Sequence, residues 1–164
     1  MYADFPRVAQ SSAADDGSRY GQLCDALSRS PAARASQRDE CFSFVERFVQ
    51  GLIRFLEIPP DLVRLALPDG SLDEAPLTVS GASSLAEDGF WQTGLNLTIR
   101  GRAGRSPSMV VTLVVHVKKK DGVLSFKLFP DGPILRIADA SGADLSPAYD
   151  LVFQQLLTWL HSPA

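Results

Sequence analysis

The stretch Glu40–Glu57 constrains the fold more than any other part of the chain. Its apolar residues recur at intervals of three and four, which predicts an α-helix, and they cover most of its circumference: Cys41, Phe42, Phe44, Val45, Phe48, Val49, Leu52, Ile53, Phe55 and Leu56. A helix with so wide an apolar face must be covered from two directions. We therefore expect a sheet on one side of it and a further element on the other. Pro59 and Pro60 end the helix, because proline lacks the amide donor.

From residue 90 onward the apolar residues alternate with polar ones, which is the period of a β-strand. A half-buried strand is predicted over 93–100. The next strand, Met109–Val117, is apolar on both faces, so it belongs in the middle of a sheet. Asp121 and Gly122 predict a tight hairpin turn, because this pair tolerates positive φ. Two further short strands are expected at 123–129 and 134–137.

The region 61–80 stays open between helix and strand, although Leu77–Val79 favours a short strand. Near the end of the chain, Ser146 is a suitable N-cap and Pro147 a suitable first helical residue. The helix predicted there buries Tyr149, Val152, Phe153, Leu156, Leu157 and Leu160. The sequence thus predicts an α+β fold: a long apolar helix, an antiparallel meander sheet of four or more strands, and a C-terminal closing helix.

Residues 1–38 differ in composition from the rest of the chain. They are rich in Ala, Ser, Asp and Arg and contain one short helical pattern near 20–28, followed by an apparent linker at 29–38. We expect a mobile N-terminal segment over 1–38 and a single α+β domain over 39–162.

Length and composition exclude several protein classes. The chain has 164 residues, the length of one ordinary domain. No apolar run approaches about 18 residues, so we expect no membrane span. The first seven residues contain an early acid and no apolar core, which argues against a secretory signal. Two cysteines, Cys24 and Cys41, cannot form a disulfide framework, and we expect a cytoplasmic protein with reduced thiols.

The sequence contains no motif of a known catalytic or cofactor site. Nucleotide-binding glycine motifs, the nucleophile elbow and the zinc-peptidase motif are all absent, and there are only two histidines. We expect no catalytic residue, no metal and no cofactor. The alternative hypothesis is a pocket that binds a small ligand or is enzymatic. This pocket would lie between the sheet and helix 40–57. Its polar groups would be Gln92, Asn96, Thr112 and His116.

Charge is distributed unevenly along the chain. The net charge is −3, but residues 41–99 hold three basic and eight acidic side chains, whereas residues 100–136 hold eight basic and two acidic ones. Candidates for phosphate or other anion contacts are Arg100, Arg102, Arg105, Lys118, Lys119 and Lys120. The two groups lie at opposite ends of one predicted strand and lack aromatic residues for base stacking, which argues against nucleic acid as the partner.

Surplus apolar surface supplies the leading functional hypothesis. A helix apolar around most of its circumference and a strand apolar on both faces exceed what one small core covers. We therefore expect a non-catalytic, adaptor- or chaperone-like binding module that forms a homodimer or docks to a partner protein. Its contact surface would include Phe42, Val49, Ile53, Val110 and Val114. The ligand pocket and nucleic-acid binding through the basic loops remain the alternatives.

Overall fold

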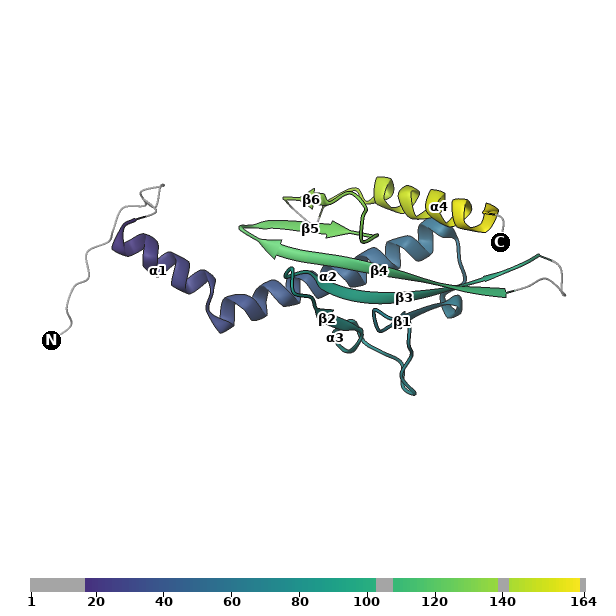
Figure 1. The fold of residues 1–164 in the computed structure, drawn as a ribbon, viewed down its shortest axis with the longest axis horizontal. Helices are drawn as coiled ribbons and strands as arrows, with labels where there is room; N and C mark the ends of the chain where they lie inside the picture. Colours follow the sequence, from purple (N-terminus) through teal and green to yellow (C-terminus); the bar gives the residue numbers. More distant parts are fainter. Residues whose placement is uncertain (1–16, 103–107, 139–141, 163–164) are drawn as a thin grey trace. The chain divides into compact units, whose positions relative to one another are not determined.

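The computed structural model describes residues 17–102, 108–138 and 142–162 (Figure 1). The chain divides into two compact units, residues 1–36 and 37–164. In the first unit, helix α1 (Arg19–Ser28) corresponds to the short helix expected near 20–28. Ser18 caps it, because its hydroxyl oxygen accepts a hydrogen bond from the Gly21 amide at 2.9 Å.

Helix α2 (Pro31–Leu56) begins nine residues before the predicted start at Glu40. The linker prediction for 29–38 was therefore wrong over residues 31–38. These residues lack an apolar stripe, but Ala, Arg and Gln all favour the helical state, and proline is well tolerated in a first turn. The hydroxyl oxygen of Ser30 accepts a hydrogen bond from the Ala33 amide at 3.2 Å at this end. At its other end the helix stops before Pro59, as predicted.

The second unit contains a six-stranded antiparallel sheet, so the predicted α+β class is confirmed. Its strands, in the order β1-β3-β4-β5-β6 with β2 also paired to β3, are β1 (Val63–Ala66), β2 (Ser83–Leu85), β3 (Trp91–Arg100), β4 (Ser108–Lys120), β5 (Val123–Lys127) and β6 (Leu135–Ile137). Strands β3 to β6 form the predicted meander. The turn between β4 and β5 has positive φ at both Asp121 and Gly122, 52° and 76°, as the hairpin prediction requires.

Strands β1 and β2 share one edge of β3, which determines the path of the region left open by the sequence. β1 pairs with residues 94–97 of β3 and β2 with residues 91–93. A 3-10 turn, η1 (Pro60–Leu62), precedes β1, and the one-turn helix α3 (Val79–Ala82) precedes β2. The strand predicted at Leu77–Val79 was wrong, because the Thr78 hydroxyl oxygen accepts a hydrogen bond from the Gly81 amide and caps α3 instead.

The core lies on one face of the sheet and is covered by α2 and by helix α4 (Ser146–His161) (Figure 1). The ring of Phe44 packs against Phe126 of β5 at a centroid distance of 4.9 Å. Phe48 packs against Tyr149 of α4 at 5.3 Å. The long helix is therefore covered from two directions, by the sheet and by α4, as its apolar circumference predicts.

Helix α4 differs from the prediction at its start and on one side. Leu145, and not Ser146, is the N-cap residue, and the carboxylate of Asp144 accepts a hydrogen bond from the Ser146 amide at 3.0 Å. Phe153 and Leu160, expected to be buried, are 39% and 41% exposed. No helix within the described ranges is long and apolar enough to cross a membrane.

A candidate binding groove between helix α2 and strand β1

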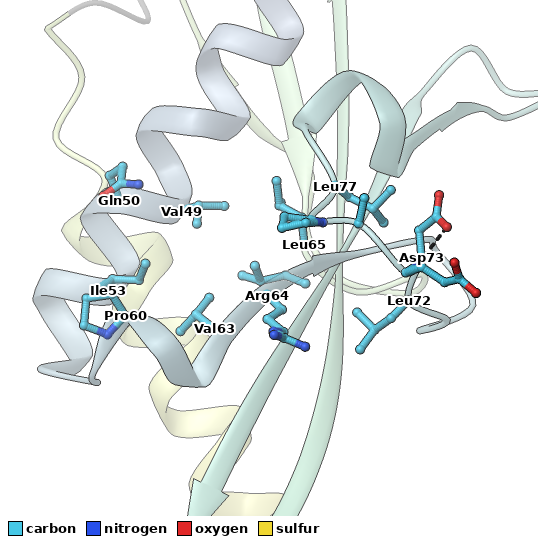
Figure 2. A pocket seen from close by; sticks show the side chains of 14 residues that line it. Val49, Gln50, Ile53, Pro60, Val63, Arg64, Leu65, Leu72, Asp73 and Leu77 are labelled. Carbon is cyan, nitrogen blue, oxygen red and sulfur yellow. Dashed lines mark hydrogen bonds between the residues drawn. The ribbon is translucent and has the colours of Figure 1, made fainter.

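A groove of about 370 Å³ lies between α2 and the edge of the sheet (Figure 2). Val49 and Ile53 of α2 form one wall. Leu72, Leu77 and the residues between them form the opposite wall, and β1 lies between the two. Leu95 of β3 contributes to the lining as well. The sequence predicts a pocket between the sheet and this helix; the groove lies there but has a different lining.

The groove exists because β1 is short and the apolar face of α2 is wide. β2 occupies the edge of β3 beyond Gly94, so the chain must leave the sheet after Ala66. It passes so close to Gly94 that a Cβ there would overlap the carbonyl groups of Ala66 and Leu67. The chain then returns through the segment 72–77, which faces α2 across the groove. Part of the apolar surface of α2 therefore borders the groove, next to the edge of β1 that no described strand pairs with.

Strand β1 presents its edge to the groove. Val63, Arg64 and Leu65 are consecutive, and all three line it. Because neighbouring side chains of a strand point to opposite faces, three consecutive residues line one groove where the strand borders it along its edge. β1 is the terminal strand of the sheet, and no second strand pairs with it among the described residues. Its outer backbone groups are therefore open to a further strand.

The polar lining of the groove consists of Gln50, Arg64, Asp73 and Glu74, all of which are exposed. Asp73 accepts a hydrogen bond from the Glu74 amide at 2.8 Å through its carboxylate. The lining includes no histidine, cysteine, serine or threonine. In the described part of the chain, no three His, Cys, Asp or Glu side chains gather closely enough to hold a metal ion. This lining suits an apolar ligand or peptide segment that makes polar contacts at the rim of the groove.

The four polar residues predicted to line a pocket share one face of the sheet, but it is not the face that α2 covers. Gln92 lies opposite His116, and Asn96 lies opposite Thr112, so the first hairpin pairs in the expected register. The neighbouring residues Leu95, Leu97 and Leu113 point to the helices and join the core. The prediction that these four residues line a pocket beneath helix 40–57 was therefore wrong.

Asn96 and Thr112 hold a turn against this outer face. The Thr112 hydroxyl donates to the Asn96 side-chain oxygen at 2.8 Å, and the Asn96 amide nitrogen donates to the carbonyl of Gly70 at 2.9 Å. The turn around Gly70, closed by a hydrogen bond from its amide to the Leu67 carbonyl, is thereby fixed over the sheet. Both side chains have their polar groups occupied by structural hydrogen bonds.

His116 is buried on the same outer face. It is 6% exposed, and neither ring nitrogen has a hydrogen-bond partner among the described residues. It lies opposite Gln92 on β3 and opposite Lys127 on β5. Burial lowers the pKa of His116, and the nearby Lys127 ammonium lowers it further, whereas Asp88 raises it. The histidine is therefore held in its neutral form and takes no part in the groove.

The predicted contact residues fall on two separate surfaces. Val49 and Ile53 line the groove. Phe42 lies about two turns closer to the N-terminus of α2 and packs edge-on against Trp91 at a centroid distance of 5.1 Å. Val110 and Val114 point to the outer face of the sheet, because they alternate along β4 with Val111, Leu113 and Val115 of the helix-facing side. One surface cannot include all five residues.

The predicted basic residues are also divided. Arg100 and Arg102 are exposed near one end of the β3–β4 hairpin, and Lys118 to Lys120 lie at the other; Arg105 is outside the described residues. The Lys119 ammonium pairs with Glu40 at 2.9 Å, and the Lys118 ammonium donates to the Asp88 carbonyl at 2.9 Å. The predicted basic residues that the structure describes therefore form no continuous anion-binding track.

A second hollow, of about 340 Å³, lies between α4 and the ends of α2 and β3. Phe153, Leu157 and Leu160 of α4 contribute to its lining, as do Leu97 and Ile99 of β3. Arg100 is the charged residue in this lining. Part of the α4 surface predicted to be buried therefore faces an apolar hollow.

Sequence reasoning missed most of the groove. The alternation of Val63 and Leu65 around Arg64 was a signal for β1, but the segment 72–77 has no period that would place it opposite α2. Only the tertiary path brings this wall into position.

Comparisons with protein-family models, with curated protein sequences and with solved structures found no match to this chain.

Proposed function

We propose that the chain is a non-catalytic binding module that docks an extended segment of a partner protein in the groove between α2 and β1. The observation that carries the proposal is the edge of β1, which lines an apolar groove with three consecutive residues. An extended peptide can add a strand to such an edge, with main-chain hydrogen bonds giving affinity and side-chain pockets giving specificity.

The lining supports a partner segment of defined chemistry. Val49, Ile53 and Leu77 offer contacts to apolar side chains on alternate positions of a strand. Asp73 and Glu74 add two exposed carboxylates at the rim of the groove, in the segment opposite α2. A segment of alternating apolar residues with a Lys or Arg directed toward these carboxylates would match both features. We place the module in a reducing compartment such as the cytoplasm, because Cys24 and Cys41 are both unpaired.

Selection from a random peptide display library against the full chain tests the proposal. We expect selected peptides to have apolar residues at alternate positions and a basic residue. Their binding should protect the outward-facing amides among Val63–Leu65 from hydrogen exchange, because alternate amides of this edge strand have no strand partner on the groove side among the described residues. Protection confined to other strands, or failure to select any binder, would contradict the proposal.

Paired variants separate binding from folding. Ile53→Glu places a charge on the half-buried groove wall and should abolish binding of the selected peptides. Ser43→Glu adds the same charge on an exposed position of the same helix and should leave binding unchanged. Leu77→Glu tests the opposite wall independently. Circular dichroism melting shows whether each variant is folded, and full binding by both folded groove variants would exclude this site.

A further inference from the structure

A further stretch of open sheet edge lies along β4. Strand β5 pairs with β4 only from His116 to Lys120. On that side of β4, no strand pairs with Ser108–Val115 among the described residues. The part nearest the β3–β4 loop is the most accessible, with Met109 50% and Val110 60% exposed. These two side chains point to opposite faces, so the apolar exposure lies on both sides of the strand.

This edge lacks the features that normally prevent strands from pairing with other chains. Natural sheets protect open edges with charged side chains, proline or very short strands. β1 carries Arg64, β6 carries Arg136, and β2 has only three residues. The segment Met109–Val115 has no charge, proline or glycine and is rich in β-branched residues. Left open, such a segment is an aggregation hazard.

We infer that this edge pairs with the same edge of a second copy of the chain, antiparallel and centred on Thr112. Antiparallel pairing of a strand with itself creates a two-fold axis perpendicular to the sheet, so the interface is closed and self-complementary. The helix-covered faces of both copies then lie on the same side of one continuous sheet. This pairing uses β4 and is independent of the partner segment proposed for β1.

The side chains favour this register over its neighbour. With Thr112 opposite Thr112 of the second copy, each exposed Val110 lies opposite Val114 of the other chain, so apolar side chains meet across the interface. Centring on Val111 would instead place Val110 opposite Thr112 and Ser108 opposite Val114, pairing apolar with polar groups. No charged residue lies in Val110–Val114, so self-pairing brings no like charges together.

Sedimentation equilibrium of the full chain tests the inference. Because a single strand pair is a small interface, we expect a reversible dimer with a dissociation constant on the order of 10 µM. The double variant of Val110→Lys and Val114→Lys places lysines opposite each other twice, and should raise that constant about tenfold or more. The exposed pair Ser43→Lys and Ser80→Lys adds the same charge elsewhere and should leave the dimer unchanged.

A charge exchange makes the test specific for the register. In the double variant of Val110→Glu and Val114→Lys, each glutamate lies opposite a lysine of the second copy, so the dimer should be restored relative to the two-lysine variant. The two positions are about 13 Å apart within one strand, too far to pair in a single chain. The single variant Val110→Lys, at the more exposed position, serves if a double variant fails to fold.

Each outcome decides the inference. A wild-type chain that stays monomeric at all concentrations overturns it, even if β4 is found to bind another protein. A folded two-lysine variant that dimerises like wild type also overturns it. Equal weakening of the charge-exchange and two-lysine variants, both folded, rejects the register centred on Thr112. Peptide binding in the β1 groove is measured separately, so the two proposals fail independently.

Discussion

Gly51 of α2 and Tyr149 of α4 lie so close together that a Cβ at position 51 would overlap the tyrosine hydroxyl and the ring carbon that carries it. The glycine therefore allows the two helices to approach while the tyrosine ring packs against Phe48 and Phe55. Glycine in the interior of a helix normally lowers stability relative to alanine. At position 51 this cost is offset, because only a residue without a side chain leaves room for Tyr149.

We predict that Gly51→Ala lowers the free energy of unfolding by about 1–3 kcal/mol, because overpacking outweighs the gain in helix propensity. Urea unfolding followed by circular dichroism measures the change. Tyr149→Leu removes both the hydroxyl and the ring carbon that the new Cβ would overlap. In that background, Gly51→Ala should no longer lower the free energy of unfolding. A more stable Gly51→Ala single variant would show that the helices do not approach as closely as described.

Phe48 and Phe55 provide a matched pair on one helix, since Phe48 is fully buried and Phe55 is 41% exposed. Phe48→Ala should cost about 3–5 kcal/mol, comparable to the total stability of a small domain, and yield insoluble or molten protein. Phe55→Ala should cost clearly less, because solvent already reaches that ring. Solubility and near-ultraviolet circular dichroism report the outcome. Similar behaviour of the two variants would place the core elsewhere.

His116 should make stability depend on pH. Its pKa in the folded chain lies below the ordinary value of 6.5, chiefly through burial. The unfolded chain therefore binds more protons as the pH falls through that ordinary value. The free energy of unfolding should decrease with falling pH, by at most about 1.4 kcal/mol per pH unit, and level off below the folded pKa. The charged groups beside the ring are Lys127, which favours this direction, and Asp88, which opposes it.

Urea unfolding between about pH 5 and pH 8 measures this dependence, and His116→Gln is the comparison. The variant should lose the part of the slope that lies below neutral pH. An unchanged slope would assign the dependence to other groups.

Cys41 should be chemically inert in the folded chain. Burial raises the pKa of its thiol to about 11 from 9.0, so almost no thiolate forms near neutral pH. A disulfide reagent such as DTNB should therefore modify half-buried Cys24 first and Cys41 only after denaturation. In Cys24→Ser no fast reaction should remain. Rapid modification of Cys41 in that folded variant would contradict its burial.

Local sequence patterns predicted most of the fold. The alternation in 93–100 and 109–117, the Asp121-Gly122 turn and the apolar face of α2 each depend on residues close in sequence, so their signals are complete within one segment. The start of α2 was missed because 31–38 has helix-favouring residues but no apolar stripe. Leu77–Val79 was misread because three apolar or β-branched residues suit a strand as well as a helix cap.

The site was harder to predict because it depends on which side of the sheet each element covers. Gln92 and His116 were correctly placed on one face, but the period of two does not tell which face the helices cover. Val49 and Ile53, predicted as contact residues, do line the groove, yet its opposite wall comes from a segment without periodicity. The hydrogen bond from Asn96 to Gly70 spans 26 positions and has no local signature.

The burial of α2 beneath β5 and α4 has a consequence for synthesis of the chain. α2 emerges from the ribosome first, whereas Phe126, which covers Phe44 and Phe48, follows about 80 residues later. At typical elongation rates of about 5–20 residues per second, the apolar side of α2 waits several seconds for its cover. During that interval the apolar side of α2 has none of its native cover from β5 and α4. Refolding from denaturant avoids this order, because every segment is present from the start.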